Sequence, residues 1–246
     1  DPGNEYAINY MWGTTGIGVN VDKVKEVLGD DAPIGSLALV FDPANMEKLS
    51  ACGVHFLDAP AEIIPAALNY IGENPDAQDA ETIQKAEPVL TAIAPYVQKF
   101  HSSEYINALA NGDICVAVGW SGDILQARDR AAEADNGVTI EFNAPKEGAL
   151  MWFDNMAIPV DAPNPDGAHK FLNFIMDAQN MAAASNYVYY ANGNLASQEF
   201  LVEDVIGDTA IYPDAETLEK LYTTSPYDAK TQRVVTRLWT KVKSGT

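Results

Sequence analysis

A carboxylate follows an apolar run that ends in glycines, within residues 114–123. The run 114–118 is typical of a buried strand, and the glycines after it indicate the entry into a helix. Ligands in open α/β sheets bind at the carboxyl ends of strands. Asp123 would lie in the first turn of the helix, where the dipole favours its charge, so Trp120 and Asp123 are candidate ligand contacts. The alternative is an aspartate that only caps the helix, with Trp120 in the core.

A second carboxylate, Asp154, interrupts the apolar run 151–156 directly after Trp152 and Phe153. A buried carboxylate needs a partner, and that partner could be a ligand ammonium, an arginine or a backbone donor. A third segment, 186–190, is rich in tyrosines, whose faces stack on alkyl chains or face cations, although aromatic stripes more often belong to a core. Together the three places fit a binding site for a ligand with an apolar chain and cationic ends.

Other chemistries have little support in the sequence. Ser121 lies where a nucleophile elbow would place its serine, but the required G-x-S-x-G fails because Asp123 stands where the second glycine is needed. His55, His101 and His169 show no spacing that identifies one of them as the base. Motifs for a dinucleotide, a phosphate loop or zinc are absent from the sequence, so we expect no enzyme, no cofactor and no metal.

The elements that must position these residues alternate between strand-like and helical patterns, which predicts the α/β class. The sequence predicts strands at 6–12, 16–21, 37–41, 54–56, 114–118, 138–142 and 156–159. It predicts helices at 22–28, 61–71, within 83–100, at 105–109, 124–134, 168–176, 179–185 and 231–242.

Composition narrows the class of ligand. The 246 residues are enough for two lobes with modest cores. A net charge of −20, from 15 basic and 35 acidic residues, repels nucleic acid and attracts cations, although acidity also simply keeps a protein soluble. The sequence has no apolar run long enough for a membrane helix. Two cysteines, Cys52 and Cys115, permit either one disulfide or two buried thiols.

Motifs spread over the whole chain carry a family resemblance, at 6–12, 14–18, 52–54, 56–60, 101–103, 105–107, 109–116, 119–120, 145–148, 190–192 and 239–245. In these motifs the chain resembles the periplasmic putrescine-binding and polyamine-binding proteins of ABC importers. The resemblance implies a type II periplasmic binding fold, in which two α/β lobes joined by crossing strands close on the ligand. It implies a second lobe of 12–132 and 199–246. Residues 1–11 and 133–198 would be the remaining part of the first lobe, incomplete at its N-terminus because family members carry a further N-terminal segment.

The resemblance also implies a set of ligand-binding residues. They are aromatic side chains that pack on the ligand, and carboxylates that receive its ammonium groups directly or through water: Trp120, Trp152, Tyr190, Asp123, Asp154 and Glu62. The family pairs the cysteines at positions 52 and 115 in a disulfide. Trp152 departs from the pattern, since the nearest relatives have phenylalanine there. Spermidine-preferring members have a tryptophan at a comparable position beside the ligand. The preferred length of the amine is therefore left open.

The implied function is periplasmic capture of putrescine or a related polyamine by a monomer that closes its lobes and delivers the ligand to an ABC transporter permease, with no nucleic-acid partner. Another cationic solute such as spermidine is the alternative within binding proteins. A serine hydrolase using Ser121 is an alternative of another class. An acidic scaffold without a ligand is a third, and it would leave Asp123 and Asp154 paired to protein donors.

Overall fold

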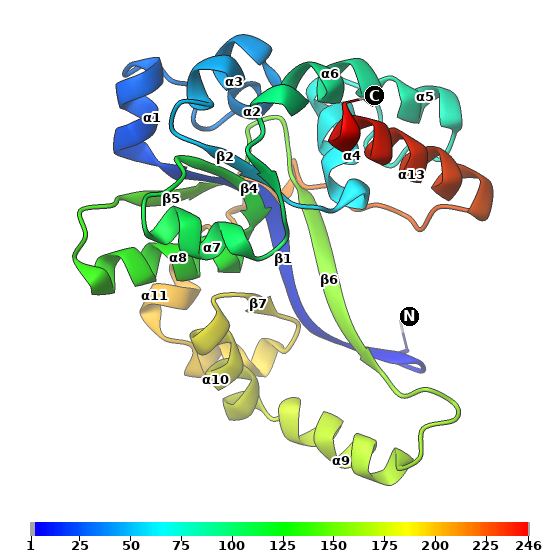
Figure 1. The fold of residues 1–246 in the computed structure, drawn as a ribbon. Helices are drawn as coiled ribbons and strands as arrows, with labels where there is room; N and C mark the ends of the chain where they lie inside the picture. The colour runs from blue at the N-terminus through cyan, green and yellow to red at the C-terminus, as the bar shows by residue number, and fades with distance from the viewer. Residues whose placement is uncertain (1–2, 246) are drawn as a thin grey trace.

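The computed structural model describes residues 3–245, and its sheet and helices confirm the predicted α/β class (Figure 1). The strands are β1 (Ala7–Asn20), β2 (Val54–Phe56), β3 (Lys99–Phe100), β4 (Val116–Trp120), β5 (Ile140–Asn143), β6 (Leu150–Ala157) and β7 (Ala191–Asn192). The helices are α1 (Val21–Leu28), α2 (Ala38–Phe41), α3 (Pro43–Leu49), α4 (Pro60–Tyr70), α5 (Ala80–Gln84), α6 (Ala86–Ile93), α7 (Glu104–Ala110), α8 (Ser121–Ala134), α9 (Pro165–Ile175), α10 (Ala178–Val188), α11 (Glu203–Ile206), α12 (Ala215–Leu218) and α13 (Ala229–Ser244), with 3₁₀ turns η1 (Ala94–Tyr96) and η2 (Leu195–Phe200).

Strand β1 organises the sheet. The strand order is β3-β2-β4-β1-β5, and β6 and β7 also pair with β1. Strand β2 runs parallel to β3 and β4, whereas β4, β5, β6 and β7 all run antiparallel to β1. Both strands that carry predicted ligand residues, β4 and β6, therefore take their register from β1.

The prediction of two separate strands at 6–12 and 16–21 is wrong, because β1 is continuous over 14 residues. Its glycines make room for aromatic rings instead of ending the strand. A Cβ atom at Gly13 would lie 2.7 Å from the Trp152 ring, and one at Gly16 would lie 2.5 Å from the Phe142 ring. Glycine within a strand often marks such a close approach.

The strand predicted at 37–41 is also wrong, since this run forms the short helix α2. The Glu147 carboxylate accepts the Leu37 backbone N–H at 3.0 Å and the Ser36 hydroxyl at the start of this helix. Short apolar runs do not distinguish strand from helix by periodicity. The strand predicted at 156–159 is only the end of the longer β6, which begins at Leu150.

Two bodies of structure are linked by β1 and β6. Figure 1 shows both strands running from the body that holds β2, β4 and α1–α6 towards α9 and α10. The main hydrophobic core gathers buried residues from Ile17 to Ile140 and from α13. A small second cluster consists of Leu125, Ala191, Val205 and Ile211. The lobe boundaries given above remain a prediction.

Cys52 and Cys115 form the disulfide that the family resemblance implies. Their Cα atoms lie 5.5 Å apart, and the bond ties the turn after α3 to the residue before β4. Among residues 3–245, no helix combines the length and apolarity needed to span a membrane.

Candidate functional site

One cavity of about 430 Å³ gathers the six ligand residues predicted from the sequence: Glu62, Trp120, Asp123, Trp152, Asp154 and Tyr190. Glu62 and Asp123 lie in the first turns of α4 and α8. Trp120 ends β4, Trp152 and Asp154 lie in β6, and Tyr190 follows α10. Strand β1 brings two of these segments together, because Thr15 pairs with Trp120 and Gly13 pairs with Trp152.

Two tyrosines hold Asp123, which lies in the first turn of α8 as predicted. The Tyr105 hydroxyl donates to Oδ2 of Asp123 at 2.7 Å, and the Tyr190 hydroxyl donates to Oδ1 at 2.9 Å. The Trp120 backbone N–H donates to the Tyr105 oxygen at 3.2 Å. Burial raises the pKa of Asp123, and the hydrogen bonds from both tyrosines oppose this. The carboxylate keeps unused lone pairs, so it can still accept from a ligand.

The glycines around Trp120 make room for the same two tyrosines. A Cβ atom at Gly119 would lie 2.6 Å from the Tyr105 ring, and one at Gly122 would lie 2.6 Å from the Tyr190 ring. The run Gly-Trp-Ser-Gly-Asp is therefore explained by the approach of two phenol rings to Asp123. Sequence reasoning missed the role of Tyr105, which it placed only within the predicted helix 105–109.

Ser121 shows no arrangement for nucleophilic catalysis. Its side chain is 2% exposed, and its Oγ accepts the Thr14 backbone N–H at 3.4 Å. Within residues 3–245, no hydrogen bond joins Ser121 to a histidine. The serine hydrolase alternative gains no support.

Glu62 is a second carboxylate with neutral partners. The Trp120 indole N–H donates to both oxygens, at 2.9 and 3.1 Å, and the Thr15 hydroxyl donates to Oε2. Burial raises the pKa of Glu62, against the effect of these hydrogen bonds. Thr15 is a further contact that sequence reasoning missed, because only the pairing of β1 with β4 brings it to this carboxylate.

Asp154 differs from the other two carboxylates. Its side chain is exposed and makes no hydrogen bond or ion pair to any residue in the described range 3–245. The neighbouring Trp152 and Tyr190 rings pack edge to face, with centroids 5.2 Å apart. An exposed carboxylate beside aromatic faces leaves a place for a cationic group.

The chemistry of the cavity suits an organic cation. Among the residues that the structure describes, its lining has three carboxylates and three aromatic side chains, and no lysine or arginine. No group of three or more histidine, cysteine, aspartate or glutamate side chains in residues 3–245 is arranged to hold a metal ion. Carboxylates can accept ammonium protons, while the rings provide a surface for methylene groups.

Comparisons with known proteins point to the same class. The profile of a family described as bacterial extracellular solute-binding protein matches residues 2–213. The chain is 54% identical over 245 residues to the putrescine-binding periplasmic protein SpuD of Pseudomonas aeruginosa (strain UCBPP-PA14), covering 100% of this chain and 67% of that relative. It is 50% identical over 246 residues to the putrescine-binding periplasmic protein PotF of Escherichia coli (strain K12), covering 100% of this chain and 66% of that relative. The chain thus spans about two thirds of the length of these relatives.

Solved structures share the fold. A putative spermidine/putrescine ABC transporter from Listeria monocytogenes aligns with a TM-score of 0.84 and 29% identity, over 99% of this chain and 70% of that one. The spermidine/putrescine substrate-binding protein PotD from Streptococcus pneumoniae aligns with a TM-score of 0.79 and 27% identity, over 99% of this chain and 70% of that one. The predicted two-lobed binding-protein fold is confirmed. Both curated relatives are named as periplasmic, in agreement with the predicted location.

Proposed function

Because the chain belongs to the family of bacterial extracellular solute-binding proteins, we propose that it reversibly binds putrescine or a related short polyamine in the cavity between β4, β6 and α8. The observation that carries this proposal is a single cavity lined by three carboxylates and three aromatic rings, with no cationic side chain from the described part of the chain. The names of the two relatives, both putrescine-binding proteins, support the choice of ligand.

A protonated diamine matches the cavity group by group. Each ammonium offers three hydrogen-bond donors. Asp154 is the acceptor for one ammonium, because it has no partner among the described residues. Asp123 is the acceptor for the other, with its geometry held by Tyr105 and Tyr190, and Glu62 lies on the same lining. The methylene groups lie against the aromatic faces, which hold an apolar chain and stabilise nearby positive charge.

No step of this function breaks a covalent bond, so the protein acts as a binding protein and not as an enzyme. The predicted lobes, 12–132 with 199–246 and 1–11 with 133–198, close on the ligand. The closed form, a monomer, then delivers the amine to an ABC transporter permease. Closure is driven by the difference in ligand affinity between the open and closed states.

Spermidine is a second candidate ligand. Trp152 gives the wall a larger face than phenylalanine, and its ring already packs on Tyr190. The change Trp152→Phe tests the choice, because a spermidine site should lose affinity for spermidine relative to putrescine in the variant. Calorimetry with both amines gives this ratio directly.

Calorimetry of putrescine binding tests the proposal, in this chain and in a protein extended to the length of its relatives. Asp123→Asn and Asp154→Asn should each weaken binding by about tenfold or more, since each loses a charge-assisted hydrogen bond. The exposed Asp31→Asn is the matched control and should bind like the parent chain. If the extended protein fails to bind, or binds equally well without both carboxylates, the proposal is wrong.

A further inference from the structure

Helix α7 is capped by a histidine that lies two residues before its N-cap position. Ser103 occupies the N-cap position, but its side chain accepts no N–H group of α7 within the described chain. Instead, the backbone N–H groups of Ser103 and Glu104 both donate to Nδ1 of His101, each at 3.2 Å, and the Ser103 hydroxyl lies 3.4 Å from the same nitrogen. A neutral histidine ring has one acceptor nitrogen, so its proton lies on Nε2, which is 3.4 Å from Oε1 of Glu104. His101 therefore caps α7 only while its ring is neutral.

This cap lies next to Tyr105, which holds Asp123 in the amine site. Tyr105 is buried in the first turn of α7, where its hydroxyl donates to Asp123 at 2.7 Å and accepts the Trp120 backbone N–H at 3.2 Å. Further along α7, the Arg130 guanidinium donates to Oδ1 of Asn107 at 2.7 Å and ties the rest of this helix to α8. Loss of the cap therefore acts mainly on the first turn, which contains Tyr105.

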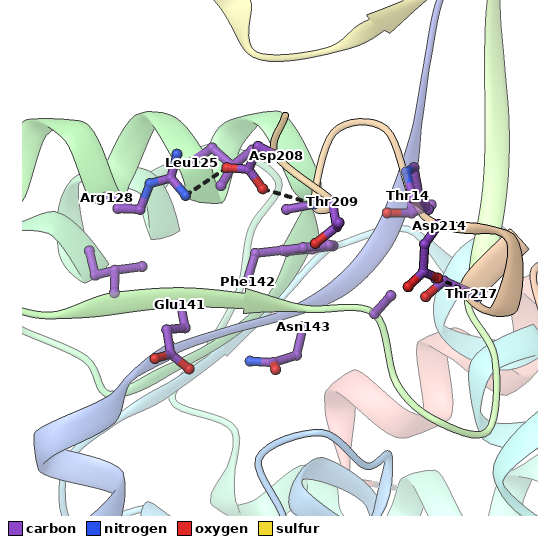
Figure 2. A pocket seen from close by; sticks show the side chains of 14 residues that line it. Thr14, Leu125, Arg128, Glu141, Phe142, Asn143, Asp208, Thr209, Asp214 and Thr217 are labelled. Atoms are coloured by element: carbon purple, nitrogen blue, oxygen red, sulfur yellow. Dashed lines mark hydrogen bonds and ion pairs between the residues drawn. The ribbon is translucent and has the colours of Figure 1, made fainter. Parts of the chain in front are cut away.

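Asp123 lies on α8, which is held by contacts that do not involve His101. Arg128 of α8 pairs with Asp208, with a nitrogen–oxygen distance of 2.9 Å. Figure 2 shows this pair beside a pocket that contains none of the six amine-site residues. At the start of α8, the Ser121 hydroxyl accepts the Thr14 backbone N–H at 3.4 Å. The contact between Tyr105 and Asp123 is thus more sensitive to the first turn of α7 than to the position of α8.

The charged groups around His101 are largely balanced. The titratable groups that face it, from α7, β3, β2, the residues before α4, and α13, are Glu104, Lys99, His55, Asp58 and Lys243. Lys99 pairs with Glu104, and Lys243 pairs with Asp58 at 2.9 Å. Burial lowers the pKa of His55, which keeps its ring neutral. Because a histidine can change its charge between about pH 5 and 8, His101 is the member of this group that can switch in that range.

We propose that His101 is a positioning residue of the amine site, and that its protonation weakens amine binding. When the ring takes up a second proton, Nδ1 changes from an acceptor to a donor, so two backbone N–H groups lose their partner. The new positive charge also lies at the N-terminus of a helix, where the dipole disfavours it. The first turn of α7 then loosens, and Tyr105 holds the Asp123 carboxylate less firmly. This inference rests on the proposed function, since it concerns the same site.

An NMR titration of the ligand-free chain between about pH 5 and 8 tests the switch without any amine. The backbone amide shifts of Glu104 and Trp120 should follow the His101 ring with the same midpoint, because Trp120 donates to the Tyr105 oxygen. In His101→Asn these transitions should disappear, since an asparagine accepts the N–H two residues on but does not titrate. Amide shifts that do not follow the ring overturn the inference, whether or not the protein binds putrescine.

Calorimetry of putrescine binding, in the protein extended to the length of its relatives, gives the second readout. From about pH 7.5 to about pH 5.5, the affinity of the parent should fall about threefold more than that of His101→Asn. The titration of Asp123 and Glu62 affects both proteins alike, so the difference isolates His101. His169→Asn, on α9, is the matched control and should keep the profile of the parent. Equal profiles of the parent and His101→Asn overturn the inference.

Tyr105→Phe distinguishes positioning of Asp123 from a general effect on the stability of α7. This variant keeps the ring but lacks the hydroxyl that reaches Asp123. In the Tyr105→Phe background, His101→Asn should therefore no longer change the pH dependence of putrescine affinity. A change as large as in the parent would show that His101 acts by a route other than Tyr105, and would overturn the positioning role.

Discussion

Asp123 illustrates how a buried carboxylate can be kept ready for a cation. Both of its oxygens already accept from tyrosine hydroxyls, and no arginine or lysine forms an ion pair with it in the described chain. Neutral donors stabilise the charged form without competing for the positive charge of a ligand. The scaffold alternative required this aspartate and Asp154 to be paired to protein donors. Asp154 is not so paired within the described range, which favours a binding site.

Tyr105 is expected to position Asp123. Its hydroxyl links the Asp123 carboxylate to the Trp120 backbone, and the residue is fully buried. Tyr105→Phe keeps the ring but removes this link, so putrescine affinity at neutral pH should fall by about fivefold. Because a hydrogen bond that favours the charged carboxylate is lost, the pKa of Asp123 should rise further, and binding should fail at a higher pH than in the parent chain. Calorimetry across pH measures both effects.

The matched control for this change is Tyr70→Phe, in α4, which packs on Phe41 away from the amine site. An unchanged pH profile in Tyr105→Phe would contradict the positioning role, even if the affinity fell. Tyr105 could not be identified from sequence because its partner lies 18 residues away on another helix. The only local signal was Gly119, whose missing side chain the Tyr105 ring requires.

Glu62 should make the ligand-free protein less stable at neutral pH. Burial raises its pKa above the ordinary 4.5, so the folded chain holds this proton more tightly than the unfolded chain. The tighter hold on this proton therefore stabilises the folded chain fully below pH 4.5, and this stabilisation is lost as pH rises through the folded-state pKa. Glu62→Gln should raise the free energy of unfolding at pH 7 by about 1 kcal/mol, and the gain should vanish near pH 4.

Urea unfolding at both pH values measures this difference. The exposed Glu81→Gln on α5 serves as control and should change little at either pH. A Glu62→Gln variant that is less stable than the parent at pH 7 would show that the hydrogen bonds from Thr15 and Trp120 outweigh the cost of burial.

At the scale of elements, sequence patterns identified most helices and the buried strands, but they wrongly predicted that glycines end a strand. Gly13 and Gly16 are typical of a break between strands, yet β1 runs through both. The reason is tertiary, since rings from β6 and β5 occupy the space of the absent side chains. A pattern within β1 alone cannot reveal a ring that arrives from residue 152. The run 37–41 was ambiguous because its structure also depends on a distant residue. The Glu147 carboxylate accepts the Leu37 backbone N–H at the start of helix α2.

The disulfide stabilises the join between α3 and β4. It closes a loop with a sequence separation of 63. The double change Cys52→Ser/Cys115→Ser should lower the free energy of unfolding by about 3 kcal/mol, mainly because the unfolded chain gains freedom. Urea unfolding with and without a reductant checks this, since reductant should destabilise the parent and leave the double variant unchanged. Equal stability of the oxidised parent and the double variant would contradict it.

At the scale of the whole molecule, the body that holds α9 and α10 exposes large apolar side chains. Phe171 is 57% exposed, Phe174 60%, Tyr187 83% and Leu195 78%. A surface of this kind is normally covered or used for contact. The 246-residue chain should therefore bind an apolar fluorescent dye while folded, and Phe171→Ser/Phe174→Ser should reduce the signal at least twofold. Leu218→Ser, at an isolated exposed leucine, is the control, and a signal equal in all three proteins would contradict the prediction.

Composition and the family resemblance together predicted the kind of ligand and most of the residues that line its site. A net charge of −20 suggested a cationic partner, and the family resemblance named six residues that the structure brings to one cavity. Neither source could reveal Thr15 beside Glu62, because this contact arises where β1 meets a helix more than 40 residues away. Such long-range pairing is set by the sheet register, which no local pattern in this sequence encodes.

The central claim is that a diamine lies in the cavity lined by Trp120, Trp152 and Tyr190. Nuclear Overhauser contacts between ¹³C-labelled putrescine and aromatic protons of the protein, extended to the length of its relatives, test it most directly. The account predicts contacts from the methylene groups to these three rings, all lost in the Asp123→Asn/Asp154→Asn variant. Contacts to other aromatic residues, or contacts that persist without both carboxylates, would contradict it.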